Sequence, residues 1–95
     1  MKTYKIVEIL HSGRKGRRYT VVTDKKYENM VNRLIRLDLD FIEQYKSVRW
    51  YFINHPFHDY WDTSAVLALQ KDDDGLWYLE TANTIYVFKE VDYDC

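Results

Sequence analysis

The spacing of hydrophobic residues changes along the chain, and it begins with an alternation typical of a β-strand. Tyr4, Ile6 and Glu8 alternate with Lys5, Val7 and Ile9, and β-branched side chains are frequent up to Leu10, which predicts a strand over 3–10. Residues 11–16 contain two glycines and predict a turn. Residues 18–23 return to strand composition, so this part of the chain predicts a β-hairpin with a long basic tip.

The apolar positions after this hairpin have a helical period instead. They are Tyr27, Met30, Val31, Leu34 and Ile35. Residues at i, i+3, i+4, i+7 and i+8 share one face of an α-helix, so this spacing predicts an amphipathic helix. Thr23 or Asp24 can accept hydrogen bonds from the free N–H groups of its first turn.

Residues 40–53 allow two interpretations. Asp40 and Glu43 have capping-box spacing, and the apolar residues that follow them continue a helical period. Val48, Trp50 and Phe52 also alternate with their neighbours in the manner of a strand. A short second helix that runs into a strand and one longer helix fit equally well.

The last third of the chain predicts three strands. Residues 54–62, with Pro56 and three aromatic residues, predict an irregular packed loop. Strands are predicted at 65–70, 76–81 and 84–91, with turns at 72–75 and 82–83, where Gly75 and Asn83 tolerate positive φ. The whole pattern predicts a single α+β domain over 1–95: an N-terminal β-hairpin, one or two helices, and a C-terminal three-stranded antiparallel meander packed on the helix.

Length and composition narrow the class of protein. Ninety-five residues with 46% hydrophobic side chains suffice for one core. The longest unbroken apolar run, residues 65–69, is far too short to cross a membrane, and Glu8 interrupts the only stretch that could serve as a secretory signal. A lone cysteine, Cys95, requires no oxidising compartment. We therefore expect a cytoplasmic protein without a membrane partner.

Charge is distributed unevenly along the chain. Residues 1–36 carry ten Lys and Arg against three acids, whereas residues 37–95 carry four against twelve. Such asymmetry is typical of proteins with charged partners, although two halves folded together can also neutralise each other. The sharpest local feature is basic: four cations with two flanking glycines at the hairpin tip, a composition suited to phosphate contacts. One interpretation is therefore a nucleic-acid-binding regulator that uses Arg14, Lys15, Arg17, Arg18, Lys25, Arg33 and Arg36.

No group of residues predicts catalysis. His55, His58, Asp59 and Asp62 lie within eight residues and include possible metal ligands, but nothing elsewhere completes a site, so we interpret them as part of a packed loop. Acidic neighbours would raise the pKa of the Cys95 thiol, which argues against a nucleophile. We expect no enzyme, no metal and no cofactor.

Aromatic residues are abundant, at 17% of the chain, and several stand beside acids in the C-terminal part. Tyr and Trp on a surface are typical anchors of protein interfaces. The sequence therefore predicts an acidic, aromatic partner-binding surface composed of Asp59, Tyr60, Trp61, Asp62, Asp72, Asp73, Asp74 and Tyr93. A third interpretation is a binder of small anionic ligands, and a monomer and a homodimer are both compatible with the sequence.

The pattern W-x-T-S-x-V from Trp61, followed after a turn by E-T-x-N-T-x-Y-x-F from Glu80, resembles the C-terminal hairpin of small proteins of phages and mobile elements. Some proteins of that kind inhibit bacterial immunity, among them anti-CRISPR proteins. Over residues 61–88 the resemblance implies a non-enzymatic inhibitor or adaptor that binds a host protein in the host cytoplasm. One target class is a nucleic-acid-handling defence protein such as a CRISPR effector.

Overall fold

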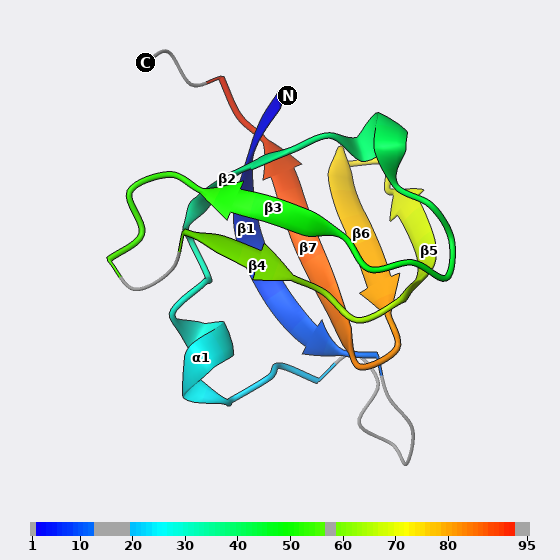
Figure 1. Ribbon diagram of the computed structural model, residues 1–95, viewed down its shortest axis with the longest axis horizontal. Coiled ribbons are helices and arrows are strands. Elements are labelled where there is room, and N and C mark those ends of the chain that lie inside the picture. The colour runs from blue at the N-terminus through cyan, green and yellow to red at the C-terminus, as the bar shows by residue number, and fades with distance from the viewer. Residues whose placement is uncertain (1, 13–19, 57–58, 93–95) are drawn as a thin grey trace.

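The chain folds into one antiparallel sheet of seven strands, as Figure 1 shows for the computed structural model, which describes residues 2–12, 20–56 and 59–92. The strand order is β4-β3-β2-β1-β7-β6-β5. The elements are β1 (Lys2–His11), α1 (Lys25–Glu28), β2 (Leu34–Leu37), the 3₁₀ helix η1 (Leu39–Phe41), β3 (Arg49–Phe52), β4 (Tyr60–Asp62), β5 (Val66–Lys71), β6 (Leu76–Thr81) and β7 (Thr84–Glu90).

The predicted α+β fold class is wrong, because the expected helix over 27–35 is a single short turn followed by a strand. Asn32 adopts a left-handed φ of 68° and donates its N–H to the Ile6 carbonyl, while Arg33 accepts the Ile6 N–H. These bonds tie the chain to β1 and start β2, in which Ile35 and Leu37 are buried with a period of two. The meander therefore packs on the other strands of the sheet, and within residues 2–12, 20–56 and 59–92 no helix of several turns lies against it.

Residues 39–52 follow the helix-then-strand alternative only in part. The strand is present as β3, but the expected second helix is the one turn of η1, where the Asp38 carboxylate accepts the Asp40 N–H. Within the predicted loop 54–62 the structure has the short strand β4, which pairs with β3. Both strands are antiparallel neighbours, with Trp50 opposite Trp61.

The three C-terminal strands lie close to their predicted bounds and form the expected antiparallel meander. The turn between β5 and β6 depends on two residues. Asp72 donates its N–H to the Leu76 carbonyl and accepts the Gly75 N–H, and Gly75 has the positive φ, 84°, that this turn requires. The Asp72 carboxylate also accepts the N–H groups of Asp74 and Leu76.

The predicted N-terminal hairpin is present only beside the end of β1. Val22 donates its N–H to the Ile9 carbonyl, and His11 donates its N–H to Thr20, so residues 20–22 run antiparallel to β1. They form one bridge, Leu10 to Val21, in place of a regular second strand. The basic tip lies outside the described residues.

The sheet curls until its two ends meet. The Tyr45 N–H donates to the Val66 carbonyl, and the Val66 N–H donates to the Lys46 carbonyl. The residues before β3 are thereby joined to the start of β5, and β3 and β4 cross over β1 and β7 (Figure 1). The result is a small, barrel-like sheet whose interior is filled by side chains.

Aromatic contacts across the interior show how tightly the sheet is curled. Trp50 on β3 is fully buried and meets Tyr86 and Phe88 on β7 edge to face, with ring centroids 4.9 and 5.4 Å apart. Strands β2 and β1 separate β3 from β7 in the sheet, so these contacts form only because the sheet folds over itself. The other buried positions of this core include Tyr4, Ile6, Ile9, Ile35, Leu37, Val66 and Leu79.

Candidate functional site

The outer face of β3 and β4 carries a cluster of large side chains because the two strands alternate. Trp50 and Trp61 point inward, which turns their neighbours outward. We call the outward set Arg49, Tyr51, Tyr60 and Asp62 the tyrosine–arginine face. Cross-strand pairing brings Arg49 opposite Asp62 and Tyr51 opposite Tyr60.

Arg49 contacts two of the other three members of this face. Its guanidinium donates two hydrogen bonds to the Asp62 carboxylate, at 2.7 and 2.9 Å, and lies 4.2 Å from the centroid of the Tyr60 ring. Tyr51 lies on the same face, two residues further along β3. Hydrogen bonding to Arg49 lowers the pKa of the Asp62 carboxyl, and the same bond raises the pKa of Arg49, so both stay charged near neutral pH.

Both tyrosines are accessible, although the Arg49 guanidinium covers one face of the Tyr60 ring. Tyr51 is 46% exposed and Tyr60 48% exposed, and they belong to the few large hydrophobic side chains on the described surface. Arg36 on β2 lies opposite Tyr51 and continues the same cross-strand row. Ordered, exposed Tyr and Arg side chains are the residue types that contribute most to protein interfaces.

The residues predicted for an acidic, aromatic surface do not all come together. Tyr60 and Asp62 belong to the tyrosine–arginine face, and Asp59 is exposed just before β4. Trp61 instead points inward, where its Nε1–H donates to the Tyr86 hydroxyl at 3.1 Å and its ring packs on Tyr27. Tyr93 lies outside the described residues.

The other predicted acids, Asp72, Asp73 and Asp74, form the turn at the far end of β5. Strand β5 has six residues, a length of roughly 20 Å, and it separates this turn from β4. The acids therefore form two separate groups, and in one of them Arg49 already binds the Asp62 carboxylate.

Arg49 was missed by the sequence prediction, and Tyr51 was not among the predicted partner-binding residues. The signal that could have found them is the alternation of residues 49–52, which places Arg49 and Tyr51 on the same side of a strand as soon as Trp50 is assigned to the core.

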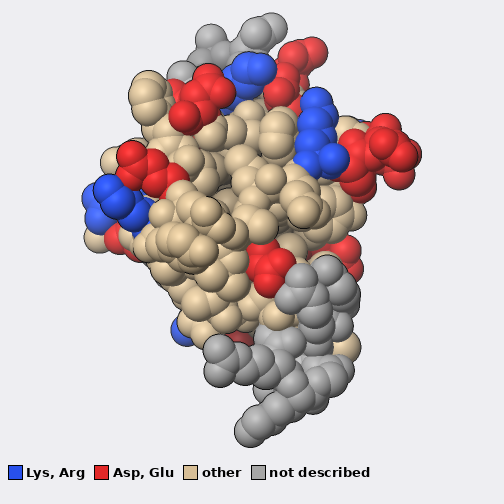
Figure 2. Space-filling view, turned by 90° about the vertical axis from the view of Figure 1, so that its right-hand side faces the viewer, with Lys and Arg blue, Asp and Glu red and all other residues tan. Residues whose placement is uncertain are grey.

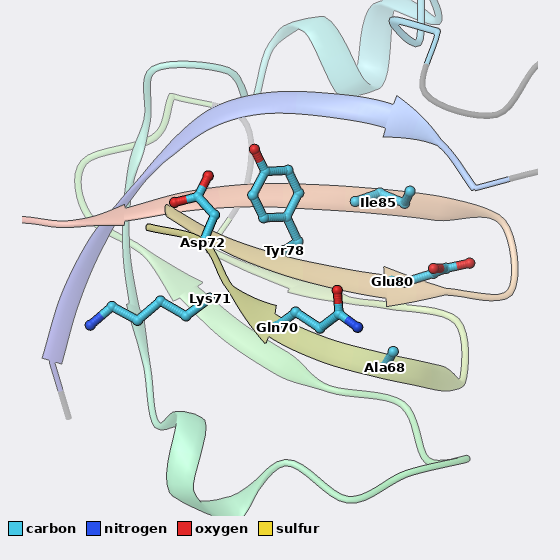
Figure 3. Close-up of a pocket in the computed structure, with 7 residues that line it drawn as sticks. All are labelled: Ala68, Gln70, Lys71, Asp72, Tyr78, Glu80 and Ile85. Atoms are coloured by element: carbon cyan, nitrogen blue, oxygen red, sulfur yellow. The ribbon is translucent and has the colours of Figure 1, made fainter. Parts of the chain in front are cut away.

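A hollow of about 420 Å³ lies over β5 and β6 (Figure 3). Asp72, Tyr78 and Glu80 project into it, whereas Lys71 extends away. Burial and a hydrogen bond to the Asp72 carboxylate raise the pKa of the Tyr78 phenol, which is therefore neutral near pH 7. With two carboxylates at its wall, this hollow does not suit the anionic ligand that was one interpretation of the sequence.

The residues predicted to bind nucleic acid are also dispersed. Arg14, Lys15, Arg17 and Arg18 lie outside the described residues. Lys25 is exposed at the start of α1, whereas Arg33 is half-buried and donates its Nε–H to the Asn29 carbonyl. Arg36 belongs to the row beside Tyr51.

His55, one of the possible metal ligands, has other contacts. Its Nε2 lies 2.9 Å from the Asn29 carbonyl oxygen, and its ring packs on Phe52 with centroids 4.8 Å apart. His58 lies outside the described residues. Over 2–12, 20–56 and 59–92, no three His, Cys, Asp or Glu side chains are grouped so that they could hold a metal ion.

Comparisons with known proteins found no matching family model, no matching curated protein and no matching solved structure. Among the residues that the structure describes, no helix has the length and hydrophobicity needed to span a membrane.

Proposed function

We propose that this protein acts by binding another protein through the tyrosine–arginine face, as a non-catalytic inhibitor or adaptor. The observation that carries the proposal is the position of Arg49, which binds Asp62 and covers the Tyr60 ring in one exposed cluster beside Tyr51. Side chains that are ordered before binding lose less conformational entropy when a partner covers them. An exposed aromatic cluster of this kind is therefore suited to a protein interface.

The same geometry favours a protein partner over a nucleic acid. Arg49 covers one face of the Tyr60 ring, so that face cannot stack on a base. Its charge is also matched by Asp62, which would repel a phosphate. Arg36, opposite Tyr51, adds one further cation to the row, and a single cation contributes little to the electrostatic attraction on which nucleic-acid binding depends.

The resemblance of residues 61–88 to small phage proteins supplies the proposed biological setting. It supports a target in the host cytoplasm, with a nucleic-acid-handling defence protein as one class. The acidic turn Asp72–Asp74 would add to attraction by a basic target surface and would make association sensitive to salt.

Site-directed photo-crosslinking tests the proposal. Benzoylphenylalanine is placed at position 51, at position 60, or at position 89, where Lys89 is equally accessible but lies on β7. After irradiation in a lysate of the source cells, we expect the same protein adduct from positions 51 and 60 and not from position 89. Adducts of equal yield at all three positions, or adducts that nuclease treatment removes, would contradict it.

A further inference from the structure

Part of β5 presents unpaired backbone groups at the edge of the sheet. The bond from the Asp72 N–H to Leu76 fixes which pairs of the β5–β6 ladder are hydrogen-bonded, because such pairs alternate with non-bonded ones. The bonded pairs are those of Gln70 with Tyr78 and of Ala68 with Glu80. The N–H and C=O groups of Leu69 and Lys71 therefore point away from β6, toward the open side of β5.

The chain before β3 occupies only the first part of this open side. Tyr45 and Lys46 lie antiparallel to β5. Both face the single residue Val66, and this two-to-one arrangement is a β-bulge. Beyond this point the Gln44 side chain donates to the Leu67 carbonyl at 3.0 Å, and the chain leaves toward η1. Beside Leu69 and Lys71 the described part of the chain places no strand.

Tyr45 has an unusual conformation at the bulge. Its φ is 69°, a left-handed value that glycine adopts easily and that costs other residues of order 1–3 kcal/mol. Its side chain is nevertheless 70% exposed, so burial of the ring does not offset this strain. Phe41, at 81%, and Leu67 are exposed on the neighbouring segments as well. Exposed apolar side chains gathered at one place mark an interaction surface.

A groove of about 360 Å³ runs along this edge and is lined by uncharged residues. They are Ile42, Gln44, Val66, Leu67, Ala68, Leu69 and Gln70. Figure 2 looks onto this side of the molecule, where uncharged residues cover most of the surface and charged ones lie mainly toward its margins. At one end of the groove is the acidic turn with Asp73 and Asp74.

We infer that this edge binds an extended segment of a partner protein, which adds to β5 as an antiparallel strand beside Leu69 and Lys71. The run at Tyr45 and Lys46 is already antiparallel, and an added strand would continue its line. The uncharged groove selects apolar side chains in the middle of the segment. An antiparallel strand begins beside Lys71, so a Lys or Arg at its N-terminal end would meet Asp73 and Asp74.

This inference rests on the proposed function, protein binding, but it uses a different surface. Unbiased 12-residue peptides displayed on phage are selected on the wild-type protein, and the enriched peptides are synthesised. Lys71→Pro removes the outward N–H, whereas the control Lys71→Ala removes the same side chain and keeps the N–H. We expect the selection to enrich apolar peptides with a basic N-terminal end. Their Kd for Lys71→Ala should lie within threefold of the wild-type value, and their Kd for Lys71→Pro should be at least tenfold larger.

Hydrogen exchange supplies a second measurement that does not depend on the proline variant folding. The amides of Leu69 and Lys71 should exchange rapidly in the free protein and at least tenfold more slowly with a selected peptide bound. Three results would overturn the inference. They are a selection that enriches no peptide, equal affinity of the two Lys71 variants for the selected peptides, and protection of other amides in place of those of Leu69 and Lys71. Protection of both amides in a concentration-dependent dimer of the chain alone would also overturn it, in favour of a second copy.

The two proposed binding surfaces can be tested independently. Tyr60→Ala should leave the affinity of the selected peptides unchanged, because Tyr60 lies on β4 outside the groove. Loss of peptide binding in Tyr60→Ala would show that the peptides bind the tyrosine–arginine face instead.

Discussion

Thr63 extends the pairing of β3 with β4, next to the residues that close the curled sheet, and Thr63→Val should measure how much this extension contributes to stability. The Thr63 hydroxyl accepts the Val48 N–H at 3.0 Å and donates to the Ser64 carbonyl at 2.7 Å, and the residue is buried. Valine has nearly the same shape, so the change removes the hydroxyl and leaves the Val48 N–H buried without a partner. Such an unsatisfied group costs about 1–3 kcal/mol.

A loss of about 2 kcal/mol corresponds to a fall in Tm of roughly 8–16 °C for a domain of this size. Urea unfolding followed by tryptophan fluorescence measures the free energy directly. Thr23→Val is the control, because Thr23 is exposed and surface changes usually stay within about 0.5 kcal/mol. Thr63→Ser, which keeps the hydroxyl, should lose only about 0.8 kcal/mol for the missing methyl. If the free energy of unfolding of Thr63→Val lies within about 0.5 kcal/mol of that of Thr23→Val, the bond from the Val48 N–H to the Thr63 hydroxyl does not stabilise the sheet.

Three further outcomes are expected. Burial raises the pKa of the Tyr86 phenol above its ordinary value near 10, so its contribution to stability is complete below about pH 10 and is lost as the pH rises above it. Between pH 8 and pH 11, urea unfolding should show a smaller fall in the free energy of unfolding for Tyr86→Phe than for wild type. An equal fall would contradict this. Gly75→Ala should cost about 1 kcal/mol from its positive φ alone, since no atom lies within 4 Å of the added Cβ, and Gly75→Asn should cost less by the same assay. Tyr45→Gly should leave the free energy of unfolding within about 1 kcal/mol of wild type, because relief of the left-handed strain offsets the chain entropy of glycine; a larger loss would show that the exposed ring stabilises the fold.

The local features of the C-terminal third could be predicted because each depends on neighbours in the sequence. The turn at 72–75 needs a residue with positive φ, and the glycine at position 75 indicates such a turn. Strands β6 and β7 begin and end close to their predicted bounds for the same reason. The error over 27–35 arose from a pattern that two structures share. Ile35 and Leu37 are buried with a period of two, but a four-residue strand is too short to separate this period from a helical one.

The curl of the sheet could not be predicted, because it depends on contacts between residues far apart in the chain. Trp50 meets Tyr86 only when β3 folds over β7, and Tyr45 meets Val66 only when the two ends of the sheet join. The candidate site was predicted in part for the same reason. Tyr60 and Asp62 were identified as a local aromatic and acidic pair, whereas the role of Arg49 follows from its cross-strand position opposite Asp62.

The most direct test of the proposed function is the affinity of the crosslinked partner, once isolated, for two alanine variants. Tyr60→Ala removes an exposed ring of the tyrosine–arginine face, and Lys89→Ala removes an exposed side chain of β7 as the control. The proposal predicts that Tyr60→Ala weakens Kd by about 30-fold or more, equivalent to the roughly 2 kcal/mol of a principal interface residue, while Lys89→Ala stays within twofold of wild type. A folded Tyr60→Ala variant that binds as tightly as Lys89→Ala would contradict it.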